Sequence, residues 1–188
     1  MGRPPQDVKR LARKLLDRFQ ITQPPVLVAD IARYLNIQVV YTHFSDNPRL
    51  SGMLMRQPDR IVMGINSAQG NNRQRFTIAH ELGHFFLDPA KPVWIDNGVG
   101  SAQVSYRLDS GSPSMYELEE VRANKFAAAL LMPEAWLRRD FEYEHEKDDV
   151  WADEDALAKS LADRYRVSLQ AMVIRLLELG LIGPQASP

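Results

Sequence analysis

The sequence contains no cysteine, and only four of its 188 residues are histidines. The absence of cysteine excludes disulfide bridges, a cysteine nucleophile, iron–sulfur clusters and every zinc site with thiolate ligands. A metal ion in this protein therefore has to be bound by histidine, aspartate, glutamate or backbone oxygen atoms.

The sequence also lacks an excess of charge of one sign and a long apolar run. Its 23 basic and 24 acidic residues give a formal net charge of -1, so no overall charge attracts nucleic acid or an anionic membrane. No apolar stretch approaches the roughly 18 residues of a membrane-spanning helix, and the N-terminus has no secretory signal. We expect a cytoplasmic protein without membrane or direct nucleic-acid partners.

Hydrophobic periodicity predicts an α+β fold that is mostly helical, with a small antiparallel sheet. Apolar residues recur at helical spacing in several segments, whereas short runs rich in β-branched residues indicate strands. The predicted helices cover residues 7–19, 26–35, 71–87, 114–132, 156–165 and 168–179. A strand is expected over residues 37–42, and a β-hairpin over residues 51–55 and 61–65.

Two segments show neither the helical nor the strand periodicity of apolar residues. Residues 88–113 are rich in glycine, serine, aspartate and proline, which is typical of a functional loop or a partly mobile one. Residues 138–155 contain many acids, and we expect an exposed, partly irregular connection there. The two helices that follow are interpreted as an ordinary helical hairpin packed on the core rather than as a DNA-binding helix-turn-helix.

The most informative motif is His80-Glu81-Leu82-Gly83-His84, in the middle of the predicted helix 71–87. Two histidines four residues apart project from one helix face, so both imidazoles can reach one metal ion. Glu81 is too close to His80 to be a convenient third ligand, but it can hydrogen-bond a water at the metal's open position. The pattern predicts a zinc hydrolase; the alternative is a set of polar residues on an amphipathic helix.

A third protein ligand is best supplied by the predicted helix 114–132. Glu120 and Asn124 share one face of this helix with small alanines, which allow close packing against Gly83. Glu120 would then point at the metal, and Asn124 could orient a ligand histidine from the second coordination layer. Glu117 and Glu119 stay open as alternatives, because helix phase is known only to about one residue.

Two blocks carry a family resemblance: Arg-Phe-Thr-Ile-Ala-His-Glu-Leu-Gly-His-Phe-Phe-Leu at 75–87, and Glu-Val-Arg-Ala-Asn-Lys-Phe-Ala-Ala-Ala-Leu-Leu-Met-Pro at 120–133. Together they resemble the ImmA/IrrE family of zinc metallopeptidases. The resemblance implies that His80, His84 and Glu120 hold Zn²⁺. The family commonly has an acidic residue directly before Ala-Asn. Arg122 stands there in this chain, which excludes a ligand role at that position and favours Glu120.

The resemblance also implies a domain organisation. We expect a zincin-like metallopeptidase domain over residues 1–135, which includes the N-terminal helices. Residues 136–188 would then form the acidic connection and a C-terminal helical extension packed on that domain.

The function that the resemblance implies is hydrolysis of a peptide bond in a protein substrate. Members of the family cut transcriptional repressors, so we expect a zinc-dependent metalloendopeptidase of the HExxH type that acts on a helix-turn-helix repressor or an antitoxin-like regulator. Glu81 would be the general base. The alternative is a regulatory binding protein with a structural or vestigial metal, which contacts a repressor or DNA. Glu81 discriminates between the two, because a purely structural site does not need it.

Two further expectations concern the substrate. Strand 61–65, if it borders the cleft, could pair its backbone with an extended peptide. The oxyanion donor stays open among Tyr106, Tyr116, Arg122 and His145.

Overall fold

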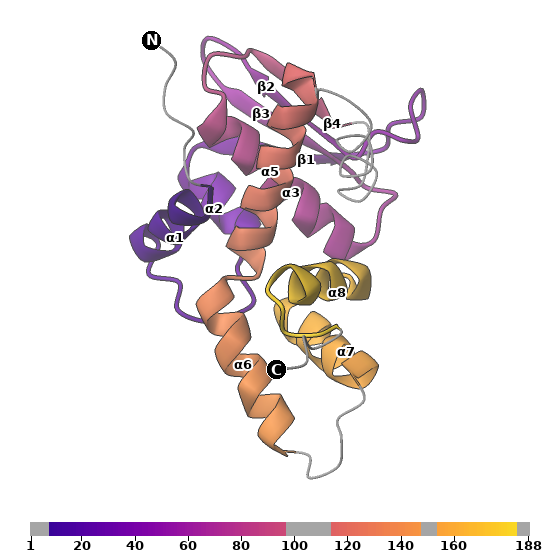
Figure 1. Cartoon of the computed structure of the whole chain (residues 1–188). Helices are drawn as coiled ribbons and strands as arrows, with labels where there is room; N and C mark the ends of the chain where they lie inside the picture. Colours follow the sequence, from indigo (N-terminus) through magenta and orange to yellow (C-terminus); the bar gives the residue numbers. More distant parts are fainter. Residues whose placement is uncertain (1–7, 97–113, 148–153, 184–188) are drawn as a thin grey trace.

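The computed structural model describes residues 8–96, 114–147 and 154–183. Figure 1 shows the sheet at the upper end, α3 and α5 through the middle, and α6 at the lower end. The elements in chain order are α1 (Val8–Arg18), α2 (Val28–Tyr34), β1 (Ile37–Thr42), β2 (Gly52–Arg56), β3 (Ile61–Asn66), α3 (Asn71–Leu87), β4 (Val93–Asp96), α5 (Met115–Leu131), α6 (Glu134–Lys147), α7 (Glu154–Tyr165) and α8 (Leu169–Glu178). Within these ranges, no helix combines the length and the apolar character needed to cross a membrane.

The sheet is mixed, so the prediction of an antiparallel sheet is wrong in one pairing. In the described part of the chain the strand order is β1-β3-β2-β4. The predicted hairpin is present, since β2 pairs antiparallel with β3. However, β1 pairs parallel with β3, because the chain runs back through β2 before it returns in β3 and so resumes the direction of β1.

The order of the strands also contradicts the expected role of strand 61–65 in binding a peptide. β3 lies between β1 and β2, so its backbone donors and acceptors are already used on both sides. Within the described sheet, the edges are β1 and β4. β4 itself was missed by the sequence analysis, because its few residues lie inside the segment 88–113 and its strand conformation depends on pairing with β2. The rest of that segment, residues 97–113, lies outside the described residues.

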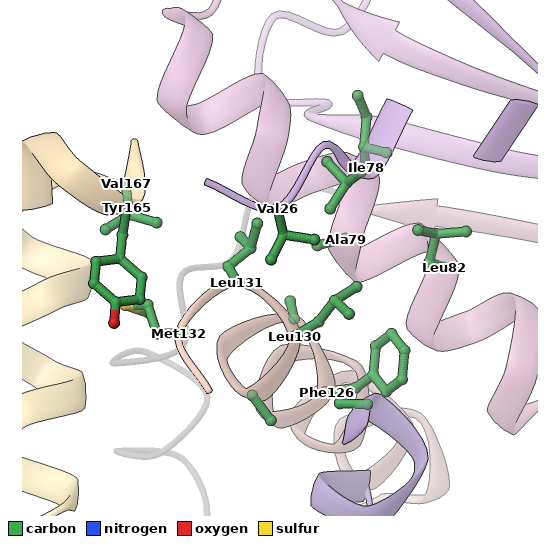
Figure 2. Packing of buried hydrophobic residues seen from close by; sticks show 14 of the residues in the cluster. Val26, Ile78, Ala79, Leu82, Phe126, Leu130, Leu131, Met132, Tyr165 and Val167 are labelled. Atoms are coloured by element: carbon green, nitrogen blue, oxygen red, sulfur yellow. The ribbon is translucent and has the colours of Figure 1, made fainter. Parts of the chain in front are cut away.

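The core is centred on the contact between α3 and α5. Figure 2 shows Ala79 and Leu82 of α3 beside Leu130 and Phe126 of α5, all buried in one cluster. Burying a leucine or phenylalanine side chain of this cluster contributes about 1.5–3 kcal/mol. The helices approach closely at Gly83: a Cβ atom built there would lie 3.0 Å from the Cα of Ala123. The small residues at this crossing therefore set the distance between α3 and α5.

The acidic segment is helical as far as Lys147, which corrects the expected irregular connection over residues 138–155. α6 begins directly after Pro133. This position suits proline, because a residue at the start of a helix does not have to donate a backbone N–H hydrogen bond. Its buried face contains Leu137 and Asp140. The acid at this buried position breaks the apolar period, so the pattern did not show a helix. Residues 148–153 lie outside the described residues.

The C-terminal helices α7 and α8 lie where the periodicity predicted them. Ser168 caps the N-terminus of α8, because its side chain accepts a hydrogen bond from the backbone N–H of Ala171 at 3.1 Å. Buried residues of both helices, including Leu161 and Met172, belong to the same cluster as the α3–α5 core.

Candidate metal centre

His80, His84 and Glu120 converge at the crossing of α3 and α5. The ligand atoms of the three side chains all lie within 4.8 Å of one another, and all three residues are buried. His80 Nε2 lies 3.3 Å from Glu120 Oε2, and His84 Nε2 lies 3.2 Å from Glu120 Oε1. The Nε2 atoms of the two imidazoles are 2.9 Å apart. The geometry therefore brings together the two histidines and the favoured glutamate.

The two other glutamates that the sequence left open have partners elsewhere. Glu117 belongs to a capping box: its carboxylate accepts from the backbone N–H of Ser114 at 2.8 Å, and the Ser114 hydroxyl accepts from the backbone N–H of Glu117. Glu119 pairs with Lys91, with 3.3 Å between Lys91 Nζ and Glu119 Oε2. The capping box fixes where α5 begins, and this start turns Glu120 toward α3.

The carboxylate of Glu120 is held in its charged form. Burial by itself raises the pKa of Glu120, but its hydrogen-bonding and electrostatic interactions with His80 and His84 oppose this effect and lower the pKa to about 2. The carboxylate therefore presents a negatively charged oxygen to a ligand bound between the imidazoles of His80 and His84.

Asn124 fixes the ring of His80. Its Oδ1 atom lies 2.9 Å from His80 Nδ1, so the imidazole donates through Nδ1. In a neutral ring this leaves the lone pair on Nε2, which is the atom that faces His84 and Glu120. The amide side chain therefore sets both the orientation and the tautomer of His80.

His84 is held differently. Its ring is stacked on the indole of Trp94, with 3.9 Å between the centroids. Its Nδ1 atom is 3.8 Å from Asp88 Oδ2, which is longer than a hydrogen bond. The two histidines thus share one site but have different supports.

Glu81 lies beside the centre, completely buried against the sheet. The space for its carboxylate is provided by Gly52 of β2: a Cβ atom built there would lie 3.2 Å from Glu81 Oε1 and collide with the methyl group of Thr77. The backbone of β2 can therefore approach α3 at the level of Glu81 only because residue 52 has no side chain.

The donor set and its spacing fit a divalent metal ion. Two imidazole nitrogens and a carboxylate oxygen are ligands that zinc accepts, at about 2.0–2.2 Å each. Ligand atoms at such distances in a tetrahedron are about 3.3 Å apart. The site is of this size: the two Nε2 atoms are 2.9 Å apart, and they lie 3.3 and 3.2 Å from different oxygens of the Glu120 carboxylate. Lone pairs that face one another in a buried site need a cation or proton between them.

The sequence analysis missed the residues that surround the centre from the sheet side. Gly52, Arg56, Lys91 and Trp94 all come from β2, β4 or the turn before β4. The one available signal was the apolar run Val-Trp-Ile at residues 93–95, which is bounded by proline and aspartate as a short strand often is.

The candidates for the oxyanion donor are not brought together. Tyr116 lies near Lys91, whose Nζ is 5.6 Å from the centre of its ring. His145 is an exposed residue of α6 that lies by Phe141. Arg122 is a half-buried residue of α5, and Tyr106 lies outside the described residues, so the described part of the structure selects no oxyanion donor.

Known proteins match both the sequence and the fold. The model of the peptidase family M78, described as the IrrE N-terminal-like domain, matches residues 32–177. The radiation response metalloprotease IrrE of Deinococcus radiodurans is 39% identical over 77 residues, which cover 41% of this chain and 21% of that protein. The alignment thus spans about a fifth of that relative's length.

A solved structure, a transcriptional regulator from Mycobacterium tuberculosis, matches with a TM-score of 0.58 and 19% identity over 91% of this chain and 55% of that one. At this identity the match shows the fold alone. The family match, in contrast, extends over more than half of the chain and includes both histidines, Glu81, Glu120 and Asn124. The chain therefore belongs to the ImmA/IrrE family, through an IrrE N-terminal-like domain.

Proposed function

We propose that this protein is a zinc-dependent metalloendopeptidase of the HExxH type, with a zincin-like domain over residues 1–135. The observation that carries the proposal is the convergence of His80, His84 and Glu120, whose ligand atoms all lie within 4.8 Å of one another, near enough to bind one metal ion. Family membership supports a metallopeptidase. The metal is proposed to be zinc, because two imidazoles, one carboxylate and no cysteine form a typical catalytic zinc set with one open position.

The chemistry that zinc supplies when bound is Lewis acidity, which makes water a nucleophile at neutral pH and polarises the scissile carbonyl group. Glu81 acts as the general base: its carboxylate accepts a proton from the attacking water and returns it to the leaving amine. Such acid–base catalysis contributes about 10²–10⁴-fold to the rate. Gly52 leaves room for this carboxylate beside the centre.

The surrounding residues keep the donor atoms in place. Asn124 accepts from His80 Nδ1 and so directs His80 Nε2 into the centre. Burial of Glu120 and both histidines excludes bulk water, which strengthens every electrostatic interaction in the site.

The proposed substrate is a helix-turn-helix repressor or an antitoxin-like regulator. This proposal is supported by the family resemblance rather than by a particular residue of the chain. The decisive assay incubates the zinc-loaded protein with the helix-turn-helix regulator encoded next to it and follows cleavage by mass spectrometry. Cleavage by the parent and its loss in Glu81→Gln are expected. Equal cleavage by Glu81→Gln would contradict the role of the base.

The metal site can be tested without a substrate. Purified Glu120→Ala is expected to lose bound zinc, whereas the control variant Glu142→Ala should retain it, because Glu142 is an exposed residue of α6 outside the donor set. Retention of zinc by Glu120→Ala would exclude the proposed ligand. Zinc binding without cleavage of any regulator would instead favour a binding protein with a structural metal.

A further inference from the structure

The indole of Trp94 is stacked on the ring of His84. The two rings are nearly parallel, with an angle of 16° between their planes and 3.9 Å between their centroids. Trp94 is only 1% exposed. Its indole N–H finds no hydrogen-bond acceptor among the described residues. The indole is therefore held by contacts with its two faces rather than by a hydrogen bond at its edge.

The opposite face of the indole carries a positive charge. Lys91 Nζ lies 3.4 Å from the centre of the Trp94 ring system, well within the range of a cation–π interaction. The same ammonium group pairs with Glu119 of α5 at 3.3 Å. Trp94 is thus enclosed between the imidazole of His84 and a lysine that is itself fixed to α5.

The turn that leads from α3 to β4 is held by Arg56 of β2. The guanidinium group donates to the carbonyl oxygen of Phe85 at 2.7 Å and to that of Lys91 at 3.0 Å. The backbone N–H of Arg56 donates to the carbonyl oxygen of Pro92 at 2.8 Å. Arg56 therefore links the last turn of α3 to the residues just before Trp94, which fixes the indole relative to the histidines.

His84 needs such a support because it lacks the hydrogen bond that orients His80. Asn124 orients His80 through a hydrogen bond of 2.9 Å, whereas His84 Nδ1 has no hydrogen-bond partner among the described residues and lies 3.8 Å from Asp88 Oδ2. An imidazole without a hydrogen bond at its second nitrogen can still rotate, unless a flat surface restrains it. The Trp94 indole provides this surface.

We propose that Trp94 is the positioning residue of His84, and that the Lys91–Glu119 pair holds the indole against the imidazole from its other face. The proposal rests on the proposed function only in taking His84 as a metal ligand. In this proposal, Trp94 of β4 and Lys91 of the preceding turn orient His84, whereas Asn124 orients His80 through a hydrogen bond.

The first experiment measures zinc affinity by competition with a chromogenic chelator. Residues that orient metal ligands typically change metal affinity about 10–100-fold. Trp94→Leu is expected to bind zinc at least about 10-fold more weakly, with partial rescue in Trp94→Phe, which retains an aromatic face. The control is Trp136→Leu on α6, a partly buried tryptophan that is not at the centre, and it should bind zinc like the parent.

The second experiment separates positioning from general destabilisation. Cobalt-loaded protein is examined by visible absorption, because ligand-field bands report the arrangement of the donor atoms. The bands should shift in Trp94→Leu and remain unchanged in Trp136→Leu, even where both variants are less stable in urea. An unchanged spectrum and unchanged affinity in Trp94→Leu would overturn the proposal.

A milder variant covers the case in which Trp94→Leu does not fold. Lys91→Met keeps the length of the side chain and removes its charge, and it should weaken zinc binding about threefold by loosening the indole. Unchanged affinity and an unchanged cobalt spectrum in both Trp94→Phe and Lys91→Met would overturn the proposal. Unchanged variants would leave the proposed function intact, provided that the parent binds metal and cleaves its substrate. A parent that binds neither zinc nor cobalt would overturn both.

Discussion

Two contacts between helices divide this molecule into parts that are built on different physical principles. Where α3 meets α5, Gly83 lies directly against the backbone of Ala123, and the ring of Phe126 packs beside it. Where α6 meets α7, the buried carboxylate of Asp140 accepts a hydrogen bond from the hydroxyl of Tyr165 at 2.9 Å. It also pairs with Arg139 at 2.8 Å and with Arg164 at 3.3 Å.

The difference shows how each contact serves its place in the fold. An apolar contact between backbones fixes the distance between α3 and α5, and this distance sets the separation of His80 and His84 from Glu120. A buried acid with three partners fixes the relative orientation of α6 and α7 more than the distance between them, because hydrogen bonds weaken steeply away from their preferred angles. The candidate metal centre lies on the first contact, and the C-terminal helices are joined through the second.

The largest expected effect comes from adding bulk at the first contact. Gly83→Leu should lower the free energy of unfolding by about 3 kcal/mol or more, because its side chain collides with the backbone of Ala123, which cannot move without shifting α5. Zinc binding should be lost in the same variant. The control is Gly70→Ala, where a Cβ atom has no neighbour within 4 Å and urea unfolding should change by less than about 1 kcal/mol.

Removal of the acid at the second contact is expected to have the next largest effect. Asp140→Ala should cost about 2–3 kcal/mol, because it leaves the buried hydroxyl of Tyr165 without its acceptor, while the two half-exposed arginines remain solvated. Zinc affinity of the folded protein should change less than twofold. The matched control is Asp163→Ala, an exposed acid on α7, for which no measurable change in urea unfolding is expected. A large loss of zinc affinity in Asp140→Ala would show that the two contacts are coupled.

A smaller effect is expected at the start of α5. Ser114→Ala removes the capping box and should destabilise the protein by about 1 kcal/mol. Since Glu120 lies less than two turns into α5, fraying of this end should also weaken zinc binding a few-fold. Ser160→Ala, an exposed position within α7, is the control and should affect neither. Equal zinc affinity in Ser114→Ala would show that the first turn of α5 does not determine the position of Glu120.

The smallest effect is expected for Tyr165→Phe, at about 0.5–1 kcal/mol near neutral pH. Burial, together with the hydrogen bond to Asp140 and its charge, raises the pKa of Tyr165 above its ordinary value of 10.0. A raised pKa means that the stabilisation is complete below pH 10 and is lost as the pH rises above it. The parent should therefore lose more stability between pH 9 and pH 11.5 than Tyr165→Phe, as measured by urea unfolding. Parallel pH profiles would contradict this.

The sequence was sufficient wherever one helix face decided the structure. The motif containing His80 and His84 lies on a helix whose bounds, Asn71–Leu87, agree with the periodicity. The face shared by Glu120 and Asn124, together with the small residues opposite Gly83, predicted the packing of α5 on α3. These inferences succeeded because neighbours on one face of a helix are fixed by local geometry.

The sequence was insufficient where a residue depends on distant pairing. The parallel partner of β1 and the strand that carries Trp94 are determined by contacts between segments far apart in the chain, for which a short apolar run gives no direction. α6 was missed for a different reason, because the buried position in its middle is Asp140. A polar residue that is buried by its partners cannot be distinguished from an exposed one before those partners are known.

Gly52 and Thr77 have a consequence for how this sequence can change over time. A methyl group added at residue 52 would collide with the methyl group of Thr77, so the side chains at the two positions compete for the same space. A substitution that enlarges residue 52 becomes tolerable only after residue 77 has shrunk, for example to alanine. Among relatives in which a side chain occupies position 52, we therefore expect position 77 to vary with it, and Glu81 to keep its place.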